Sequence, residues 1–97
     1  MPSEREVFEK ALVKYGPLSQ ILMTFEEMAE LQQALNKFVR KNDGLAEIVK
    51  NIAEEIADVE IMLTQLKYMF DIDNLVAAYR ENKVERLFLK LEEVVDN

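Results

Sequence analysis

The chain has 97 residues and contains neither cysteine nor histidine. The lack of cysteine excludes disulfides and thiolate chemistry, and the lack of histidine excludes histidine-based acid–base catalysis and histidine-ligated zinc. Glycine and proline number two each, too few for a turn-rich β-sandwich. Because no apolar run is long enough to cross a bilayer and the N-terminus lacks a signal-peptide pattern, we expect a cytoplasmic protein without a membrane partner.

Acidic residues outnumber basic ones by 19 to 12, which gives a formal net charge of −7. This balance disfavours binding to a nucleic-acid polymer, because phosphate backbones select basic surfaces. An acidic surface can still bind a polyanionic nucleotide if a metal ion mediates the contact. Length and composition together predict one soluble helical domain over residues 1–97.

Hydrophobic residues recur by threes and fours, which predicts an all-α fold, an antiparallel bundle of about four helices. The expected bounds are about residues 4–15, 18–41, 45–70 and, after an N-cap at Asp73 or Asn74, onward to residue 94. Ser3 and Glu6 form a capping box at the first helix, and Gly16-Pro17 ends it. Turns are expected at residues 42–44, where Gly44 is free to take a positive φ, and at residues 71–74.

Two apolar stripes dominate the long central helices. They are Ile21, Phe25, Met28, Leu35 and Val39 in the second helix, and Ile48, Ile52, Ile56, Val59, Leu63, Leu66 and Phe70 in the third. Further apolar residues, Leu22, Ile61 and Tyr68, lie on other sides. A helix that is apolar on several sides needs more cover than a small monomer provides, so we expect the bundle to be completed by oligomerisation. The alternative is scattered exposed apolar residues, which are normal on any surface.

Four acidic residues are expected to meet between these helices. Glu55 and Asp58 lie beside the apolar stripe of the third helix, and Glu27 and Glu30 lie on the second. In an antiparallel hairpin, residues equidistant from the turn sit at the same height, which pairs Glu30 with Glu55 and Glu27 with Asp58. The two levels are about 4.5 Å apart, from a rise of about 1.5 Å per residue.

Four ionised carboxylates this close repel one another strongly unless something compensates them. All-oxygen ligation suits a hard cation such as Mg²⁺ or Mn²⁺. The alternative is that these are ordinary solvated helix charges, because a single Glu-x-x-Glu is common. The match between pairs on adjoining helices makes a metal site as well supported as that alternative.

The segments Glu27-Met-Ala-Glu30 and Glu55-Ile-Ala-Asp58 together resemble the Glu-x-x-Glu … Glu-x-x-Asp signature of the MazG-like nucleotide pyrophosphohydrolases, of the all-α NTP pyrophosphatase superfamily. The similarity covers about residues 15 to 90. It implies a homodimer or dimer of dimers, with Mg²⁺, or Mn²⁺ as a substitute, held by these four residues at the catalytic centre. It also implies hydrolysis of an NTP or dNTP to the monophosphate and pyrophosphate, and suggests a house-cleaning role in the nucleotide pool.

Basic groups for the substrate phosphates are expected after the metal helices. The stretch Asn82-Lys83-Val-Glu-Arg86 resembles the Asn- and Lys-containing stretch of relatives, so Lys83 and Arg86 are assigned to the substrate. Their alternative role is surface charge or intersubunit pairing. Gln20 shares the helical stripe of Glu27 and is expected to approach the nucleotide. With no histidine, cysteine or obvious serine nucleophile, direct attack by water is the simplest mechanism.

Two other functions compete with hydrolysis. The first is a noncatalytic helical oligomer that keeps the fold and acts as an interaction module. The second is a carboxylate-bridged di-iron bundle, which ranks last because that design uses Glu-x-x-His ligands and this chain has no histidine.

Overall fold

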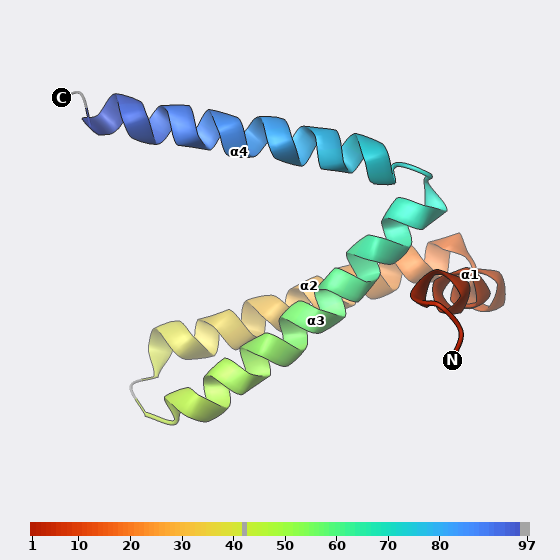
Figure 1. Cartoon of the computed structure of the whole chain (residues 1–97). Coiled ribbons are helices and arrows are strands. Elements are labelled where there is room, and N and C mark those ends of the chain that lie inside the picture. The colour runs from red at the N-terminus through yellow and green to blue at the C-terminus, as the bar shows by residue number, and fades with distance from the viewer. Residues whose placement is uncertain (42, 96–97) are drawn as a thin grey trace.

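The structure is a computed structural model that describes residues 1–41 and 43–95. Within them it contains four helices and no strand (Figure 1). The helices are α1 (Glu4–Tyr15), α2 (Pro17–Arg40), α3 (Leu45–Met69) and α4 (Asp73–Val95). The predicted all-α class is therefore confirmed, and the bounds of the first three helices match to within a residue or two. The fourth helix already includes Asp73, so the N-cap predicted at Asp73 or Asn74 is wrong.

The turn between α1 and α2 contains a single non-helical residue. At the other end of α1, Ser3 Oγ accepts from the Glu6 N–H at 3.1 Å, which is the N-cap hydrogen bond of the predicted capping box. The Ser3 hydroxyl also donates to Glu6 Oε1 at 3.2 Å. Gly16 takes φ 85° and ψ 160°, a backbone conformation that residues other than glycine rarely adopt. Its N–H donates to the Leu12 carbonyl at 2.8 Å. Pro17 then opens α2, where its missing N–H leaves no hydrogen bond unmade.

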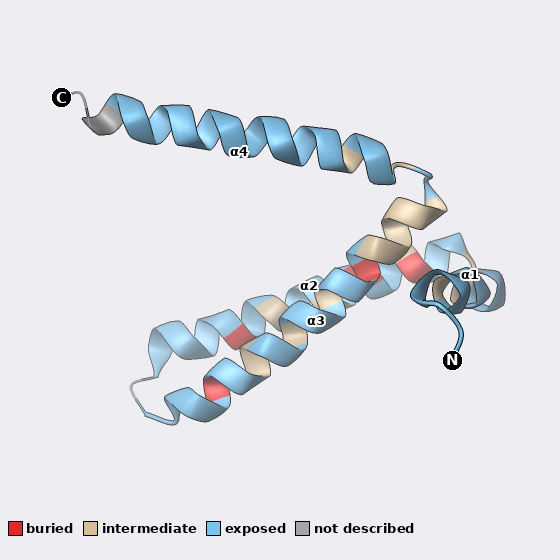
Figure 2. Ribbon diagram, in the orientation of Figure 1, coloured by how far each residue is buried: buried red, intermediate tan, exposed pale blue. Residues whose placement is uncertain are grey.

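Helices α2 and α3 form an antiparallel hairpin (Figure 1). Gly44 caps α3 with a φ of 67°, the positive value expected of it, while Asn42 of the same predicted turn lies outside the described residues. The buried positions in this hairpin are few (Figure 2). They are Gln20, Thr24 and Ala34 of α2, with Ile48 and Met62 of α3. The seam between the two helices is thus narrow and partly polar.

The seam leaves most of the predicted apolar stripes uncovered. Phe25 is 61% exposed and Val39 is 80% exposed, whereas Thr24 is only 4% exposed. The small residues Thr24 and Ala34 let α3 approach α2 closely. Each precedes a residue of the apolar stripe by one position, so the face of α2 that meets α3 lies about 100° around the helix from that stripe. In α3 the predicted stripe partly enters the seam, because Ile48 is buried and Ile52 is half-buried, whereas Ile56 and Leu63 stay exposed on the same side as the apolar stripe of α2.

The hairpin consequently has two unlike sides. We call one side the apolar face, and it consists of Ile21, Phe25, Met28, Leu35 and Val39 from α2 with Val49, Ile56 and Leu63 from α3. We call the opposite side the carboxylate face, because Glu26, Glu30, Glu54 and Asp58 project there by the same helical periodicity. Each acidic pair sits at the edge of the seam.

Within residues 1–41 and 43–95, helix α4 packs only against the end of α3 from which it continues. Asp71 turns the chain with a φ of 54°, and Lys67 Nζ lies 3.7 Å from Asp73 Oδ1 across the turn. Beyond that junction α4 diverges from the hairpin and is exposed along nearly its whole length (Figure 2). The radius of gyration is 17.4 Å, against about 12.5 Å for a compact chain of this length. None of the helices in the described residues is long and apolar enough to cross a membrane.

The two glycines should respond differently to the same substitution. Gly44 lies near the left-handed helical region, which asparagine tolerates, whereas the φ and ψ of Gly16 suit glycine alone. A Cβ at either position meets no atom within 4 Å, so any difference comes from the backbone. We expect Gly16→Asn to lower the free energy of unfolding by about 1–3 kcal/mol and Gly44→Asn by less than about 1 kcal/mol. Urea titration at one fixed protein concentration measures both, and equal losses would contradict this account.

Candidate metal centre

Four carboxylates from two helices meet at the middle of the hairpin. Glu27 and Glu30 come from α2, and Glu55 and Asp58 come from α3. One carboxylate oxygen from each lies within 4.8 Å of the corresponding oxygen of every other. A spacing of three residues keeps both members of a pair on one side of their helix. The antiparallel register expected from the position of the turn therefore brings these four side chains together, and we call them the carboxylate cluster.

Two oxygens of the carboxylate cluster are shielded from solvent and have no hydrogen-bond partner, Glu27 Oε2 and Glu55 Oε2. Burying a polar atom without a partner costs free energy, and the cost is larger for a charged group. The ion pairs that the structure shows in the described residues lie elsewhere and do not neutralise the cluster. They join Arg5 to Glu9, Lys50 to Glu47, and Lys67 to Asp73.

The carboxylate cluster changes the acidity of two of its members. Burial raises the pKa of the Glu27 carboxyl above its ordinary value of 4.5, and the negative charges of the other three members raise it further. Burial likewise raises the pKa of Glu55, followed by the charges of Glu30 and Asp58 and a hydrogen bond with the Glu30 carboxyl. In both cases the folded protein disfavours the ionised form at this site.

The donor set fits a hard divalent cation. All four ligands are carboxylate oxygens, which Mg²⁺ and Mn²⁺ prefer to softer nitrogen and sulfur donors. Opposite oxygens around one Mg²⁺ are about 4.1 Å apart, so a cluster spanning 4.8 Å needs only a small contraction. A cation would also supply the partner that Glu27 Oε2 and Glu55 Oε2 lack.

A cleft of about 370 Å³ adjoins the carboxylate cluster at the end nearer α1. Its lining residues are Ala11, Tyr15, Ser19, Gln20, Met23, Met62 and Gln65. Met23 precedes Glu27 by four residues, so the cleft begins about 6 Å along α2 from the cluster. The volume is in the range of small-molecule sites, and the lining combines an aromatic ring and thioethers with polar amides.

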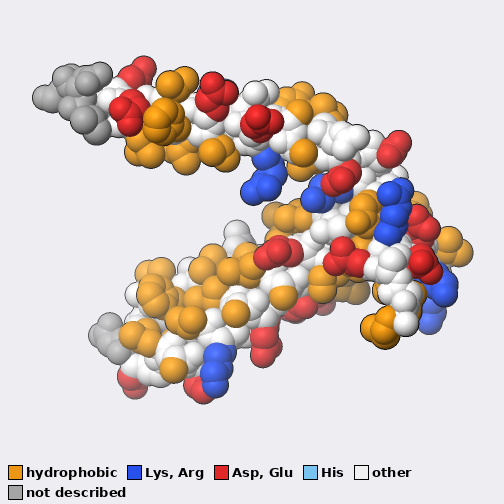
Figure 3. Space-filling model, in the orientation of Figure 1, with side chains coloured by type: hydrophobic (Ala, Val, Ile, Leu, Met, Phe, Trp, Pro, Cys, Tyr) orange, Lys and Arg blue, Asp and Glu red, His pale blue; other side chains and the backbone are white. Residues whose placement is uncertain are grey.

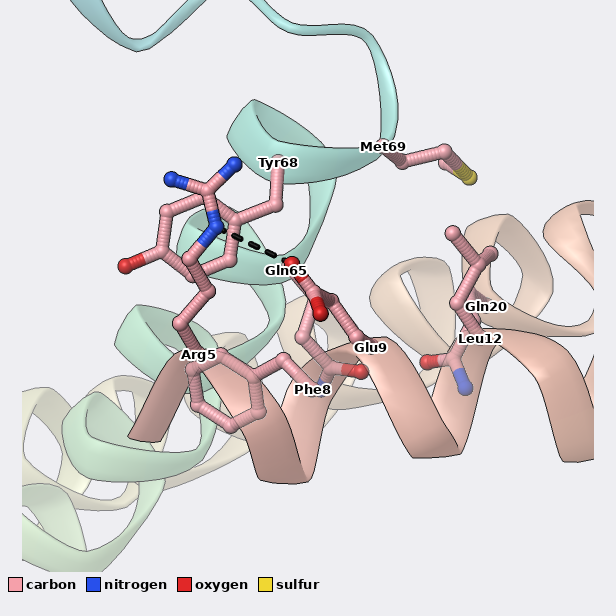
Figure 4. A pocket seen from close by; sticks show the side chains of 8 residues that line it. All are labelled: Arg5, Phe8, Glu9, Leu12, Gln20, Gln65, Tyr68 and Met69. Carbon is pink, nitrogen blue, oxygen red and sulfur yellow. Dashed lines mark hydrogen bonds and ion pairs between the residues drawn. The ribbon is translucent and has the colours of Figure 1, made fainter. Parts of the chain in front are cut away.

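Helix α1 closes one end of this cleft, and Gln20 holds it there. Gln20 Nε2 donates to the Ala11 carbonyl at 3.4 Å. Next to that contact, the Arg5 guanidinium lies 5.0 Å from the centre of the Tyr68 ring, and Arg5 Nε donates to Glu9 Oε1 at 3.0 Å (Figure 4). Gln20, predicted to approach the nucleotide, therefore lies in the cleft wall and ties α1 to α2.

The two predicted basic residues lie apart from the cluster in a single chain. Lys83 and Arg86 are exposed on α4. Between the described residues, α4 makes no contact with α2 and meets α3 only near their junction. One chain alone thus brings together the four carboxylates. Gln20 lies about 10 Å along α2 from Glu27, and Lys83 and Arg86 lie on α4, away from the cluster.

Sequence reasoning missed two parts of this arrangement. Neither Tyr15 nor Gln65 is among the residues that the sequence assigns to the site. Both line the cleft, and the buried Gln65 Oε1 has no hydrogen-bond partner. The register that pairs Gln65 with Gln20 was the available signal for Gln65, whereas the place of Tyr15 depends on how α1 folds back.

No family model, curated protein or solved structure matches this chain. The resemblance of its two acidic motifs to the MazG-like enzymes therefore remains a hypothesis, and the function has to be argued from the site.

Without divalent metal, stability should fall as the pH rises above about 4.5. The raised pKa values of Glu27 and Glu55 mean that the folded state binds more protons than the unfolded state in this range, so raising the pH favours unfolding. We expect Glu55→Gln to show a smaller decrease in melting temperature between pH 4.5 and 7 in EDTA. Glu60→Gln, an exposed change on the same helix, should keep the wild-type slope. Identical slopes for all three proteins would contradict the electrostatic account.

Divalent metal should reverse that loss at neutral pH. A cation that binds only the folded state stabilises it by about 2.7 kcal/mol at a concentration 100 times its dissociation constant. We expect Mg²⁺ and Mn²⁺ to raise the melting temperature of the wild type and of Glu60→Gln, but much less that of Glu55→Gln. Calorimetric titration with Mn²⁺ measures binding directly, and equal affinity in Glu55→Gln would place the metal elsewhere.

Proposed function

We propose that this protein is a Mg²⁺-dependent nucleoside triphosphate pyrophosphohydrolase, which cleaves an NTP or dNTP to the monophosphate and pyrophosphate. The observation that carries the proposal is the carboxylate cluster, with two buried oxygens that lack partners, beside a cleft of nucleoside size. The proposal includes a homo-oligomeric state, a cytoplasmic location and a role in removing unwanted nucleotides.

In this proposal the four members of the carboxylate cluster hold Mg²⁺. The bound metal supplies positive charge that neutralises phosphate oxygens as negative charge develops on them. Glu30 is exposed, so its carboxylate is well placed to orient water arriving from solvent and to accept its proton. The water oxygen forms the new bond to the α-phosphorus, the bond to the bridging oxygen breaks, and pyrophosphate leaves.

The cleft gives the nucleoside a place next to the phosphates. Tyr15 offers a partly exposed ring to a base or sugar, and Met23 and Met62 offer adaptable apolar contact. The amides of Gln20 and Gln65 supply polar groups in the same wall, and Gln65 Oε1 is an acceptor without a partner. Lys83 and Arg86 remain the proposed phosphate-binding residues, and they require a second chain to reach the cluster.

A noncatalytic interaction module is the second candidate function. The large uncovered apolar face of the hairpin favours a binding role of some kind. Binding alone, however, gives no reason for four carboxylates in the seam, where they cost stability. The two candidates are separated by whether the protein turns over nucleotides in a metal-dependent way.

The first test incubates the purified protein with a panel of NTPs and dNTPs in Mg²⁺ or in EDTA and identifies the products. We expect nucleoside monophosphate and pyrophosphate in Mg²⁺ only. Glu55→Ala and Asp58→Ala should each lower kcat/KM by about 100-fold or more, the usual effect of losing a charged group that stabilises the transition state.

The control for this test is Glu47→Ala, which removes an exposed carboxylate paired with Lys50 at 3.6 Å on the same helix. It should leave turnover unchanged. Release of orthophosphate would indicate a different phosphatase reaction, and full activity in Glu55→Ala would show that the site is elsewhere.

A further inference from the structure

Two glutamine side chains meet at the end of the cleft away from the carboxylate cluster. Gln20 of α2 is buried and Gln65 of α3 is half-buried. Besides the cleft, both line a smaller cavity of about 50 Å³ under α1, and their side chains point toward each other there (Figure 4). The two amides thus stand between the open cleft and a closed space that suits one small polar group.

The hydrogen bonds of the two amides fix how each is oriented. Gln20 Nε2 donates to the Ala11 carbonyl at 3.4 Å, and Gln65 Nε2 donates to the Met62 sulfur at 3.5 Å. A carbonyl and a thioether only accept hydrogen bonds, so the nitrogen of each amide, and not its oxygen, must lie against them. The amide oxygens are therefore the acceptors left for a ligand. Gln65 Oε1 is shielded from solvent and has no hydrogen-bond partner.

The cleft that leads to these amides has an uncharged lining. Its polar groups are hydroxyls and amides, and its apolar groups include the Tyr15 ring and the thioethers of Met23 and Met62. Outside the cleft, charged side chains of both signs lie over α1 and the adjoining end of α3 (Figure 3). An uncharged lining of this kind suits a nucleobase and not a phosphate group.

One nucleotide can span the distance from the carboxylate cluster to the amides. Gln20 precedes Glu27 by seven residues and Gln65 follows Asp58 by seven, so both amides lie about 10 Å along the helices from the cluster. In a nucleotide, the exocyclic amino group of cytosine or adenine is about ten bonds from the α-phosphorus, which gives a reach of up to about 12 Å at about 1.2 Å per bond. A phosphate at the cluster and a base edge at the amides can therefore belong to one molecule.

Two neighbouring acceptors favour a ligand group that donates to both. An amino group has two N–H donors, so it can bond to both amide oxygens at once. A carbonyl oxygen in the same place would add a third acceptor and would leave Gln65 Oε1 buried without a partner. Sites that form a hydrogen bond with a substrate group reject analogues that lack this group far more strongly than apolar pockets reject a change in size.

We propose that Gln65, together with Gln20, selects nucleotides whose base has an exocyclic amino group, cytosine or adenine, over the keto counterparts uracil and hypoxanthine. The base lies in the cleft beside Tyr15, and its amino group donates to Gln65 Oε1 and to the amide oxygen of Gln20. The deaminated nucleotides are then poor substrates. The use of this selection in hydrolysis rests on the proposed function, whereas binding of the base depends on the cleft alone.

Matched substrate pairs test the selection in turnover. CTP and UTP differ at the amino position, and so do ATP and ITP, while ring size and phosphates stay the same within each pair. We expect kcat/KM in Mg²⁺ to be at least about 30-fold higher for the amino member of each pair, because the keto member leaves a buried acceptor unpaired. Equal values within the pairs, or a preference for the keto members, would overturn the proposal.

Gln65→Met separates selection from a structural role of the same side chain. Methionine has a similar length and helix propensity but no amide. We expect the ratio of kcat/KM for CTP to that for UTP to fall to within about threefold of one. In EDTA without nucleotide, the melting temperature should rise by about 4 °C, because an unpaired buried acceptor is removed.

The control for this variant is Gln33→Met, which changes an exposed glutamine of α2 and should alter neither quantity. If Gln65→Met kept the wild-type ratio, the assigned role of Gln65 would be wrong. A lower melting temperature of Gln65→Met would show that its amide is a structural group.

Binding of nucleosides tests the selection without metal or turnover. The wild-type protein is titrated in EDTA with cytidine or with uridine, and NMR follows the side-chain amide signals of Gln20 and Gln65, which are assigned by their loss in Gln20→Met and Gln65→Met. We expect cytidine to shift both signals with a dissociation constant at least 10-fold lower than that of uridine. Equal dissociation constants, or no shift with cytidine, would refute the selection. If cytidine binds as expected but the protein hydrolyses no nucleotide, only the proposed hydrolysis is refuted.

Discussion

The mutual repulsion of four carboxylates in the seam between α2 and α3 is the constraint on which the rest of this structure depends. Glu27 and Glu55 each place one oxygen out of solvent and without a partner. Nearby, the seam contains small or polar residues, such as Thr24 and Ala34, in place of a large apolar core. The contact between α2 and α3 is therefore weakest where their acidic residues meet. A divalent cation at that point would bind carboxylates of both helices and so replace their repulsion with a shared attraction.

Because small and polar residues occupy the seam between α2 and α3, large apolar residues are left exposed elsewhere in the fold. The large apolar residues of both helices, such as Phe25 and Ile56, are turned to one side of the hairpin and stay exposed. Helix α4 continues from α3 on that same side but does not cover it (Figure 1). The placement of the carboxylates and the exposure of the large apolar residues thus have a common origin, because the helix face that enters the seam can carry only one of the two stripes.

Helix α1 has a different role, since it shapes the space beside the carboxylates. Gln20 ties it to the hairpin through the Ala11 carbonyl, and the contact of Phe8 with Tyr68, whose ring centres are 6.1 Å apart, fixes its other end. The result is a cleft next to an acidic centre, the combination on which the proposed nucleotide hydrolysis rests. Neither feature would suggest a substrate without the other.

Local sequence was sufficient for the helices and for the carboxylate cluster. Capping by Ser3, the Gly16-Pro17 break and the positive φ of Gly44 depend on neighbouring residues, and a short turn fixes the register that aligns Glu30 with Glu55. Which stripe enters the seam could not be read in this way, because spacing shows that a face is apolar but not what will cover it. The cleft beside Tyr15 follows from the contacts of α1 with α2 and α3, which exist only once the helices have packed. The course of α4, and with it the separation of Lys83 from the carboxylates, follows from the turn at Asp71, whose positive φ the residue types around it do not reveal.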